Sequence, residues 1–263
     1  MNLQFLIIDT QNDFAHPDGS LFVPGADQDS ERLAAMLKRH LSQIDEIHVT
    51  LDTHHWLDIA HPIFWVDTQG NHPAPFTIIT EEDVLNGHWK TKQPDFQNRA
   101  TEYVKTLKTN GRYDLTIWPP HCLIGKAGHN VVTPIAEALT EWEDTFAMVN
   151  YAMKGANIWT EHYSAVKADV PDPNDPSTWL NMHLMDSLKQ ADLIACSGQA
   201  LSHCVANTLR DIADHLGEEN LSKIVLIEDT TSPVPGFEEM GQQFLADLQE
   251  RGMRTVKSSE FLV

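Results

Sequence analysis

The stretch Leu3–Asp9, which reads LQFLIID, decides the fold class, because it is a short apolar run that ends in an acid. Such a run is typical of a strand that is buried on both faces of a parallel sheet and whose last residue emerges at the carboxyl edge. A helical pattern follows from Ser30 to Leu41, where apolar residues recur three and four positions apart, and Glu46–Leu51 predicts a second strand that ends at Asp52.

The same alternation continues to the C-terminus. It predicts helices at Val131–Thr145, Thr178–Gln190, Cys204–Leu216 and Phe237–Arg251, and strands at Phe146–Met153, Asp192–Ser197 and Lys223–Glu228. Strands that alternate with helices imply right-handed crossovers, so we expect an α/β fold with a doubly wound, mostly parallel sheet and helices on both faces. Ligands of such sheets bind at the carboxyl ends of the strands.

Two segments interrupt this alternation. Pro62–Arg112 is rich in Pro, Gly, Asn and aromatic residues and shows no sustained helical or strand period. Since loops of this length are usually functional or disordered, its aromatic residues predict a packed excursion that serves as a lid or an oligomer contact. Asp169–Ser177 carries three prolines and predicts a rigid surface turn. We therefore expect a single domain over residues 1–263, with an inserted excursion at about 62–112.

The composition excludes several classes of protein. The chain of 263 residues carries 38 Asp and Glu against 18 Lys and Arg, a formal net charge of -20, which repels nucleic acid and anionic lipid. A hydrophobic share of 41% excludes a disordered chain, and no apolar stretch approaches the roughly 20 residues of a membrane span. Met1–Phe5 lacks the features of a secretion signal. We expect a soluble, cytoplasmic protein that binds neither nucleic acid nor membrane and that is compatible with a homo-oligomer.

One carboxylate and three imidazoles lie on loops expected to follow neighbouring strands. The candidate metal ligands are Asp52, His54, His61 and His121. This set suits a divalent transition metal such as Zn, Fe or Mn. Because the chain has 14 histidines, chance clusters are the alternative, and a strand-end Asp-x-His is also compatible with a solvated turn. His55 and Asp58 are competing ligands, whereas His72 and His88 lie in the excursion and are weaker candidates.

Cys204 lies at the start of a predicted helix, after a strand and a glycine turn. A nucleophile is expected at such a position. A thiol in the first turn of a helix experiences the positive end of the dipole, which favours the thiolate, and free backbone N–H groups can hold an oxyanion. The alternative is a small buried hydrophobic residue. Cys196 lies in the middle of a predicted strand, so we expect it to be an inert residue of the core. We expect Cys122 to serve in packing. Three cysteines cannot all pair and are too sparse for a disulfide framework.

Asp9 and Lys154 each end an apolar strand and would point from the same sheet edge. A carboxylate can take the thiol proton and pass it to a leaving group, while a buried ammonium stabilises negative charge. Taken alone, Asp9 is equally compatible with a turn cap and Lys154 with a surface residue.

Five short motifs occur together in one order along the chain. They are DTQNDF at Asp9–Phe14, Asp52 and His54 with His61, WPPHC at Trp118–Cys122 followed by Gly125 and Gly128, Lys154-Gly155 with Tyr163-Ser164, and Gly198 followed by Cys204-Val205. In this order the chain resembles the nicotinamidase/pyrazinamidase branch of the isochorismatase-like cysteine hydrolases. It departs from that family at Leu201-Ser202, where Thr-Asp is usual, at Gly125-Lys126, where Gly-Thr is usual, and in its longer excursion.

The resemblance implies a role for each matching residue. It implies a catalytic triad of Asp9, Lys154 and Cys204, and a metal (zinc first, iron or manganese otherwise) held by Asp52, His54, His61 and His121. It also implies a cis peptide at Gln199-Ala200 and an oxyanion hole formed by the N–H groups of Ala200 and Cys204. The implied substrate contacts are Phe14, Trp118, Gln199 and Tyr163. The expected activity is hydrolysis of a nicotinamide-like primary amide to its acid and ammonia through a thioester. The alternatives are a related hydrolase of another small amide or carbamoyl compound, and a non-catalytic metal-binding relative.

Overall fold

A six-stranded parallel sheet forms the centre of the molecule. The structure, a computed structural model, describes residues 1–110 and 113–262. The strands are β1 (Leu3–Ile8), β2 (Glu46–Asp52), β7 (Asn150–Lys154), β8 (Leu193–Gly198), β9 (Ile224–Ile227) and β10 (Arg254–Val256), in the order β10-β9-β8-β1-β2-β7. Every neighbouring pair in this sheet is parallel. The predicted fold class is therefore confirmed, with the buried run of the N-terminus at the centre of the sheet.

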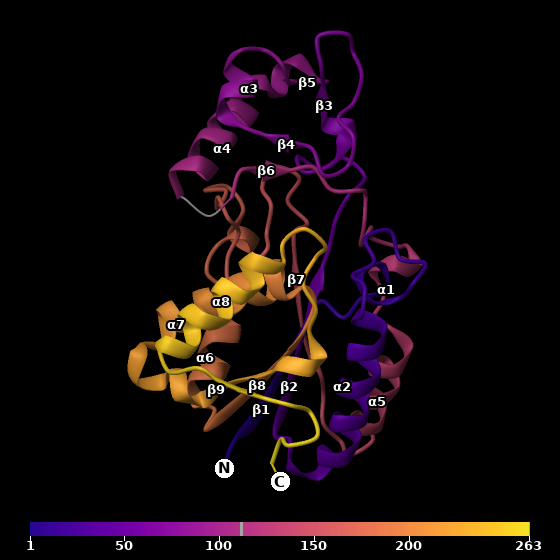
Figure 1. The fold of residues 1–263 in the computed structure, drawn as a ribbon, viewed down its shortest axis with the longest axis vertical. Coiled ribbons are helices and arrows are strands. Elements are labelled where there is room, and N and C mark those ends of the chain that lie inside the picture. Colours follow the sequence, from indigo (N-terminus) through magenta and orange to yellow (C-terminus); the bar gives the residue numbers. More distant parts are fainter. Residues whose placement is uncertain (111–112, 263) are drawn as a thin grey trace.

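Helices cover both sides of the sheet, as Figure 1 shows. On one side lie α2 (Ala26–His40) and α5 (Thr133–Glu143), and on the other lie α6 (Met182–Gln190), α7 (Ala206–Leu216) and α8 (Glu238–Glu250). Helix α2 shows why apolar spacing predicts a helix here, since it buries Leu33, Met36 and Leu37 on one stripe. It also carries acids in its first turn and bases in its last, which suits the helix dipole. The short helix α1 (Asn12–Ala15) was not predicted.

Three predicted boundaries are wrong, each for a local reason. Helix α2 begins at Ala26 and not at Ser30, because its first turn carries Asp27 and Asp29 and lacks the apolar spacing of the rest. Strand β7 begins at Asn150 and not at Phe146, because Phe146 is fully exposed in a left-handed turn with φ 65°. Helix α6 begins at Met182 and not at Thr178, because the side chain of Asn181 caps the helix by accepting the N–H of Leu184. β10 was also not predicted, since its three residues are only half-buried or exposed.

The excursion lies beyond the carboxyl end of the sheet, at the top of Figure 1. It contains β3 (Trp65–Val66), β4 (Ile78–Ile79), α3 (Glu81–Leu85), β5 (Lys90–Thr91) and α4 (Gln97–Asn110), and β4 pairs with β6 (Leu115–Thr116) just after it. The expectation of no sustained period is wrong for α4, which buries Ala100, Tyr103, Val104 and Leu107 at helical spacing. The last two residues of the predicted excursion, 111 and 112, lie outside the described residues. Within the described ranges, no helix is long and apolar enough to cross a membrane.

Candidate active site

The candidate catalytic residues come from three strands of the sheet, the neighbours β8 and β1 and the strand β7, which β2 separates from β1. Asp9 directly follows β1, Lys154 ends β7, and Cys204 follows β8 after a short turn. Gly198 permits this turn, because its φ of 121° is in the left-handed region and a Cβ there would collide with the carbonyl oxygen of Ile8. Parallel strands end at one edge, so the three side chains meet there.

Lys154 is the centre of this group of side chains. Its Nζ lies 2.9 Å from Asp9 Oδ2 and 2.9 Å from Asp52 Oδ1, and it donates to the carbonyl oxygen of His162 at 2.9 Å and to the Cys204 Sγ at 3.5 Å. Burial lowers the pKa of Lys154, but the carboxylates of Asp52 and Asp9 outweigh burial and hold this pKa well above its usual value. The group is therefore a buried ammonium in contact with both the acid and the thiol.

The pKa values of the Asp9 carboxyl and the Cys204 thiol are both raised above their usual values. Burial raises the pKa of Asp9, which Lys154 partly offsets, and the Thr50 hydroxyl donates to its Oδ1 at 2.5 Å. Burial likewise raises the pKa of the Cys204 thiol well above its usual value, with Lys154 opposing this rise. Burial thus acts against the thiolate that the helix start is expected to favour, and Lys154 acts for it. Asp9 forms a side-chain hydrogen bond with this thiol, so its carboxylate is placed to receive the thiol proton.

The turn that carries Cys204 is a single π-helical turn, Leu201–Val205, which continues into α7. As the resemblance implies, the peptide Gln199-Ala200 before it is cis. In the described chain, the Ala200 N–H donates no hydrogen bond. It is therefore free to donate to a ligand beside the Cys204 thiol.

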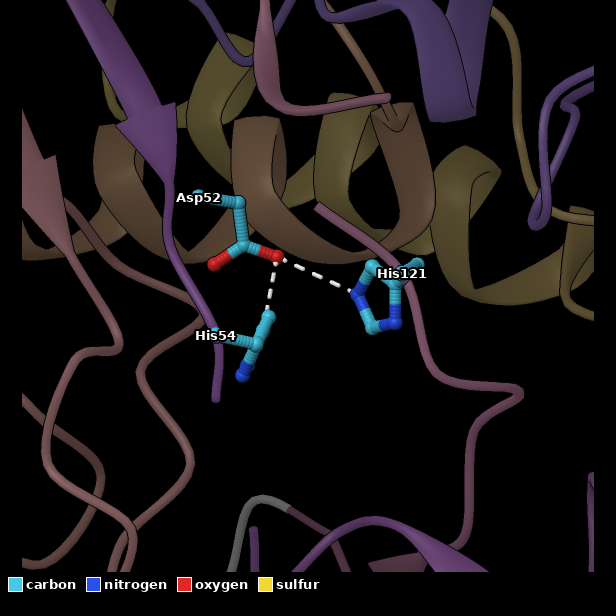
Figure 2. A group of neighbouring side chains, drawn as sticks. All are labelled: Asp52, His54 and His121. Carbon is cyan, nitrogen blue, oxygen red and sulfur yellow. Dashed lines mark hydrogen bonds and ion pairs between the residues drawn. The ribbon is translucent and has the colours of Figure 1, made fainter. Parts of the chain in front are cut away.

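Three of the four predicted metal ligands converge directly. Figure 2 shows Asp52, His54 and His121 turned toward one another, with Asp52 Oδ2 3.0 Å from His54 Nε2 and 3.2 Å from His121 Nε2. One ligand atom from each lies within 4.8 Å of the others, and all three residues are buried. A carboxylate and two imidazole nitrogens at this spacing can hold a divalent transition metal.

His61 stands beside these three residues with a free ligand atom. Its ring centroid lies 5.2 Å from that of His54 and 5.8 Å from that of His121. Its Nε2 is buried and finds no hydrogen-bond partner among the described residues, and burial lowers its pKa to about 4. A neutral, unpartnered imidazole nitrogen is what a fourth ligand requires, so the residues present fit a metal.

The competing candidate ligands lie elsewhere. Asp58 Oδ2 accepts a hydrogen bond from His54 Nδ1 at 3.0 Å, so it orients this imidazole from behind. His55 is exposed, His72 donates to the carbonyl oxygen of Trp65, and His88 stacks on Trp89 in the excursion. None of these four belongs to the group of converging ligands.

A narrow cavity opens between the thiol and the candidate metal ligands. Its wall contains Phe14, Leu21, Asp52, Trp118, His121, Glu161, Tyr163, Ala200, His203, Cys204 and Val234. Trp118 Nε1 donates to the Tyr163 hydroxyl at 3.0 Å, which fixes two of the aromatic walls. The Gln199 side chain is not in this wall, since it donates to Asp29 and accepts from the Ser232 N–H.

Four residues of this wall are not predicted from the sequence: Leu21, Glu161, His203 and Val234. Glu161 Oε1 accepts the His162 N–H, its Oε2 has no partner in the described chain, and burial raises its pKa to about 8. His203 packs against Trp118 and Phe237, and burial lowers its pKa to about 4. His203 directly precedes Cys204 and Glu161 lies two residues before Tyr163, but neither position distinguishes a site residue, because a lone Glu or His in a loop is common.

Comparison with known proteins gives a likeness of fold. No family model and no curated protein matches the chain. Among solved structures, the yeast nicotinamidase Pnc1p bound to the inhibitor nicotinaldehyde is 18% identical, with a TM-score of 0.68 over 97% of this chain and 99% of that one. The pyrazinamidase of Pyrococcus horikoshii in complex with zinc is 17% identical, with a TM-score of 0.59 over 98% and 99%. PnC1 from L. infantum in complex with nicotinate is 22% identical, with a TM-score of 0.60 over 98% and 93%.

These likenesses establish the class of fold. The chain has the isochorismatase-like α/β fold. Within that class, its fold is the one seen in nicotinamidases and pyrazinamidases, as the motifs predicted.

Proposed function

We propose that the protein is a metal-dependent cysteine amidohydrolase of the nicotinamidase/pyrazinamidase type, which cleaves a nicotinamide-like primary amide to a carboxylic acid and ammonia. One observation carries the proposal: the buried ammonium of Lys154 contacts the Asp9 carboxylate and the Cys204 thiol at the end of an aromatic-walled cavity. A base, a cation and a nucleophile in mutual contact are the groups that acyl transfer through a thioester requires.

In the first half of the proposed reaction, Asp9 takes the proton of Cys204 as the sulfur forms a bond to the amide carbon. The N–H groups of Ala200 and Cys204 hold the oxyanion, and Lys154 stabilises the negative charge that moves from carboxylate to sulfur. Asp9 then returns the proton to the amide nitrogen, the C–N bond breaks, and ammonia leaves. The carbonyl carbon remains bound to sulfur as a thioester.

In the second half, water replaces ammonia. Asp9 takes a proton from water as the oxygen attacks the thioester, and it returns that proton to the sulfur when the C–S bond breaks. The products are the carboxylic acid and the original thiol. The same carboxylate thus serves as base and acid in both halves, which fits a pKa raised by burial.

Asp52, His54, His61 and His121 are the residues that would hold the metal, for which we propose zinc, with iron or manganese as alternatives. A divalent metal bound there supplies a Lewis acid that can orient a ring nitrogen of the substrate. The zinc complex of the Pyrococcus horikoshii pyrazinamidase supports this choice of metal. Phe14, Trp118 and Tyr163 would supply the walls around the ring, and nicotinate and nicotinaldehyde bound to two similar structures support a flat pyridine ring as the ligand.

Three broader proposals accompany this one. We propose that residues 1–263 form a single domain with the excursion inserted in it. Among the described residues, sheet and excursion contribute to the same cluster of buried hydrophobic side chains, which supports this proposal. We propose a cytoplasmic location, because all three cysteines are free and buried. A homo-oligomer is compatible with the chain, and the partner of the reaction is a small amide.

The test is ammonia release from nicotinamide and from benzamide, which lacks the ring nitrogen. Loss of one metal contact should cost a few kcal/mol in kcat/KM, so nicotinamide should be preferred by more than about tenfold. Equal rates would contradict the proposed ring-binding mode, and no ammonia from either amide, or from pyrazinamide, would contradict the proposed substrate class.

A pair of cysteine variants tests the nucleophile. Cys204→Ala should abolish turnover and keep the fold, whereas Cys196→Ala, in the buried interior of β8, should keep turnover. Thioester formation in the Cys204→Ala protein would overturn the assignment.

A further inference from the structure

A second cavity of about 410 Å³ lies beside β7 and shares no wall residue with the candidate active site. Its wall is formed by the edge strand β7 and by the segment that leads into α6, including Asn150, Tyr151, Ala152, Met153, Trp179 and Met182. Its volume is in the range of small-molecule sites, which is about 300–1,000 Å³.

The segment Glu161–Tyr163 separates the two cavities. Glu161 and Tyr163 line the candidate active site, whereas His162 between them lines the second cavity. The N–H of His162 is used by Glu161 and its carbonyl oxygen by Lys154, so its imidazole is the part of the residue whose polar atoms remain. One residue therefore contacts Lys154 through its backbone and also lines the second cavity.

The imidazole of His162 is held in one tautomer. Its Nδ1 accepts the N–H of Gly155 at 3.2 Å, so Nδ1 carries no proton. Burial lowers its pKa to about 3, so the ring is neutral and its single proton is on Nε2. Nε2 is buried and has no partner within the described chain. A buried donor without an acceptor destabilises the folded protein, and a ligand that supplies an acceptor removes this cost.

The chemistry of the wall defines which molecule can supply that acceptor. The wall contains no Lys, Arg, Asp or Glu; its basic residues are the histidines His48, His162 and His183, and the net charge of -20 disfavours an anion. The half-buried side-chain amide of Asn150 makes no hydrogen bond to any described residue, so it offers a donor and an acceptor. Tyr151, Trp179 and Met182 are about half-exposed and Met153 is largely exposed, and their rings and thioethers favour a flat aromatic ligand.

We propose that this cavity is a second binding site, for an uncharged aromatic amide whose carbonyl oxygen accepts a hydrogen bond from His162 Nε2–H and whose amide pairs with Asn150. The bound amide contacts the residue whose carbonyl oxygen holds Lys154. Binding at this site does not require the proposed function, since no catalytic residue is in the wall.

The test is equilibrium dialysis of benzamide against the Cys204→Ala protein, which consumes no amide, with benzoate as the charged analogue. Ala152→Trp fills the second cavity, and Ala35→Trp, on the exposed face of α2, is the matched control. We expect the Cys204→Ala/Ala152→Trp protein to bind one benzamide fewer per chain than Cys204→Ala and Cys204→Ala/Ala35→Trp, and benzoate to show no such difference.

Asn150→Leu provides a second variant if Ala152→Trp does not fold. It removes one hydrogen bond and should weaken benzamide binding at this site by about fivefold. Equal benzamide binding by all variants overturns the proposal, as does equal binding of benzoate at the same site. A change from dimer to monomer with no loss of benzamide would show that a second copy covers this cavity and would also overturn it. Absence of amide turnover by the wild-type protein would count only against the proposed function.

Discussion

Replacement of Lys154 by Met should destabilise the protein in a pH-dependent way. Lys154 is buried and lies 2.9 Å from the carboxylates of both Asp9 and Asp52, so its removal leaves two buried acids without their shared cation. Breaking a buried pair by removing one partner costs about 3–5 kcal/mol. We therefore expect a loss of about 4 kcal/mol in the free energy of unfolding at pH 7.5, or roughly a thousandfold in the ratio of folded to unfolded protein.

The loss should be smaller at pH 5, and the sign follows from Asp9. Its pKa is already raised by burial, and Lys154 is the group that lowers it, so removal of Lys154 raises the pKa of Asp9 further. An acid with a raised pKa in the folded state contributes stability at low pH that is lost as the pH rises. Asp9 therefore takes up a proton at pH 5 in the variant, and the deficit grows between pH 5 and pH 7.5.

Urea unfolding followed by circular dichroism measures this deficit at both pH values. Lys189→Met is the matched control, because Lys189 lies on the surface of α6 beside an exposed Asp186 and should cost less than about 1 kcal/mol. Asp9→Asn in the Lys154→Met background should recover part of the loss, since it removes one of the stranded charges. A loss below about 1 kcal/mol, or the same loss at both pH values, would refute the reasoning.

Two further predictions concern residues around the catalytic group. Asp58→Asn weakens the orientation of His54 Nδ1 and should lower zinc affinity about 10–100-fold in a competition assay with a chelator, and unchanged affinity would show that Asp58 does not orient this ligand. His162, whose pKa is about 3, contributes stability above pH 6.5 that is lost as the pH falls, so the free energy of unfolding should drop by about 2 kcal/mol from this group by pH 5. His162→Gln should flatten this part of the stability curve, and an unchanged slope would contradict the assignment.

The sheet was predictable because its central strands are buried on both faces. Leu3–Ile8 and Leu193–Gly198 are buried along their whole length, so their apolar runs differ clearly from the surrounding polar residues. At the sheet edge this signal fails. Phe146 and Met148 are apolar but exposed, and they extended the predicted strand β7 into a turn. The helix α4 was missed because its apolar stripe is narrow and lies within a segment dominated by loop residues.

The positions of site residues were predictable where the residue type is rare or belongs to a motif. Properties that depend on tertiary packing, such as the protonation state of a side chain, were not predictable. Asp9, Lys154 and the converging ligands end strands or belong to motifs, so their positions follow from topology. The protonation state of Cys204 does not follow from topology, because burial by distant segments raises the pKa of its thiol. The same holds for Glu161, whose unpartnered oxygen results from the way its loop packs over the sheet edge.

The central position of β1 also has a consequence for synthesis. On one side β1 pairs with β2, which emerges soon after it, but its other neighbour is β8, and the pair Ile8 and Gly198 is separated by 190 residues. At about 5–20 residues per second, ribosomal elongation needs about 10–40 s to cover that distance. Throughout that time one edge of a strand that is apolar at all positions but Gln4 is open to wrong pairing, so the nascent chain should depend on chaperones until β8 is made.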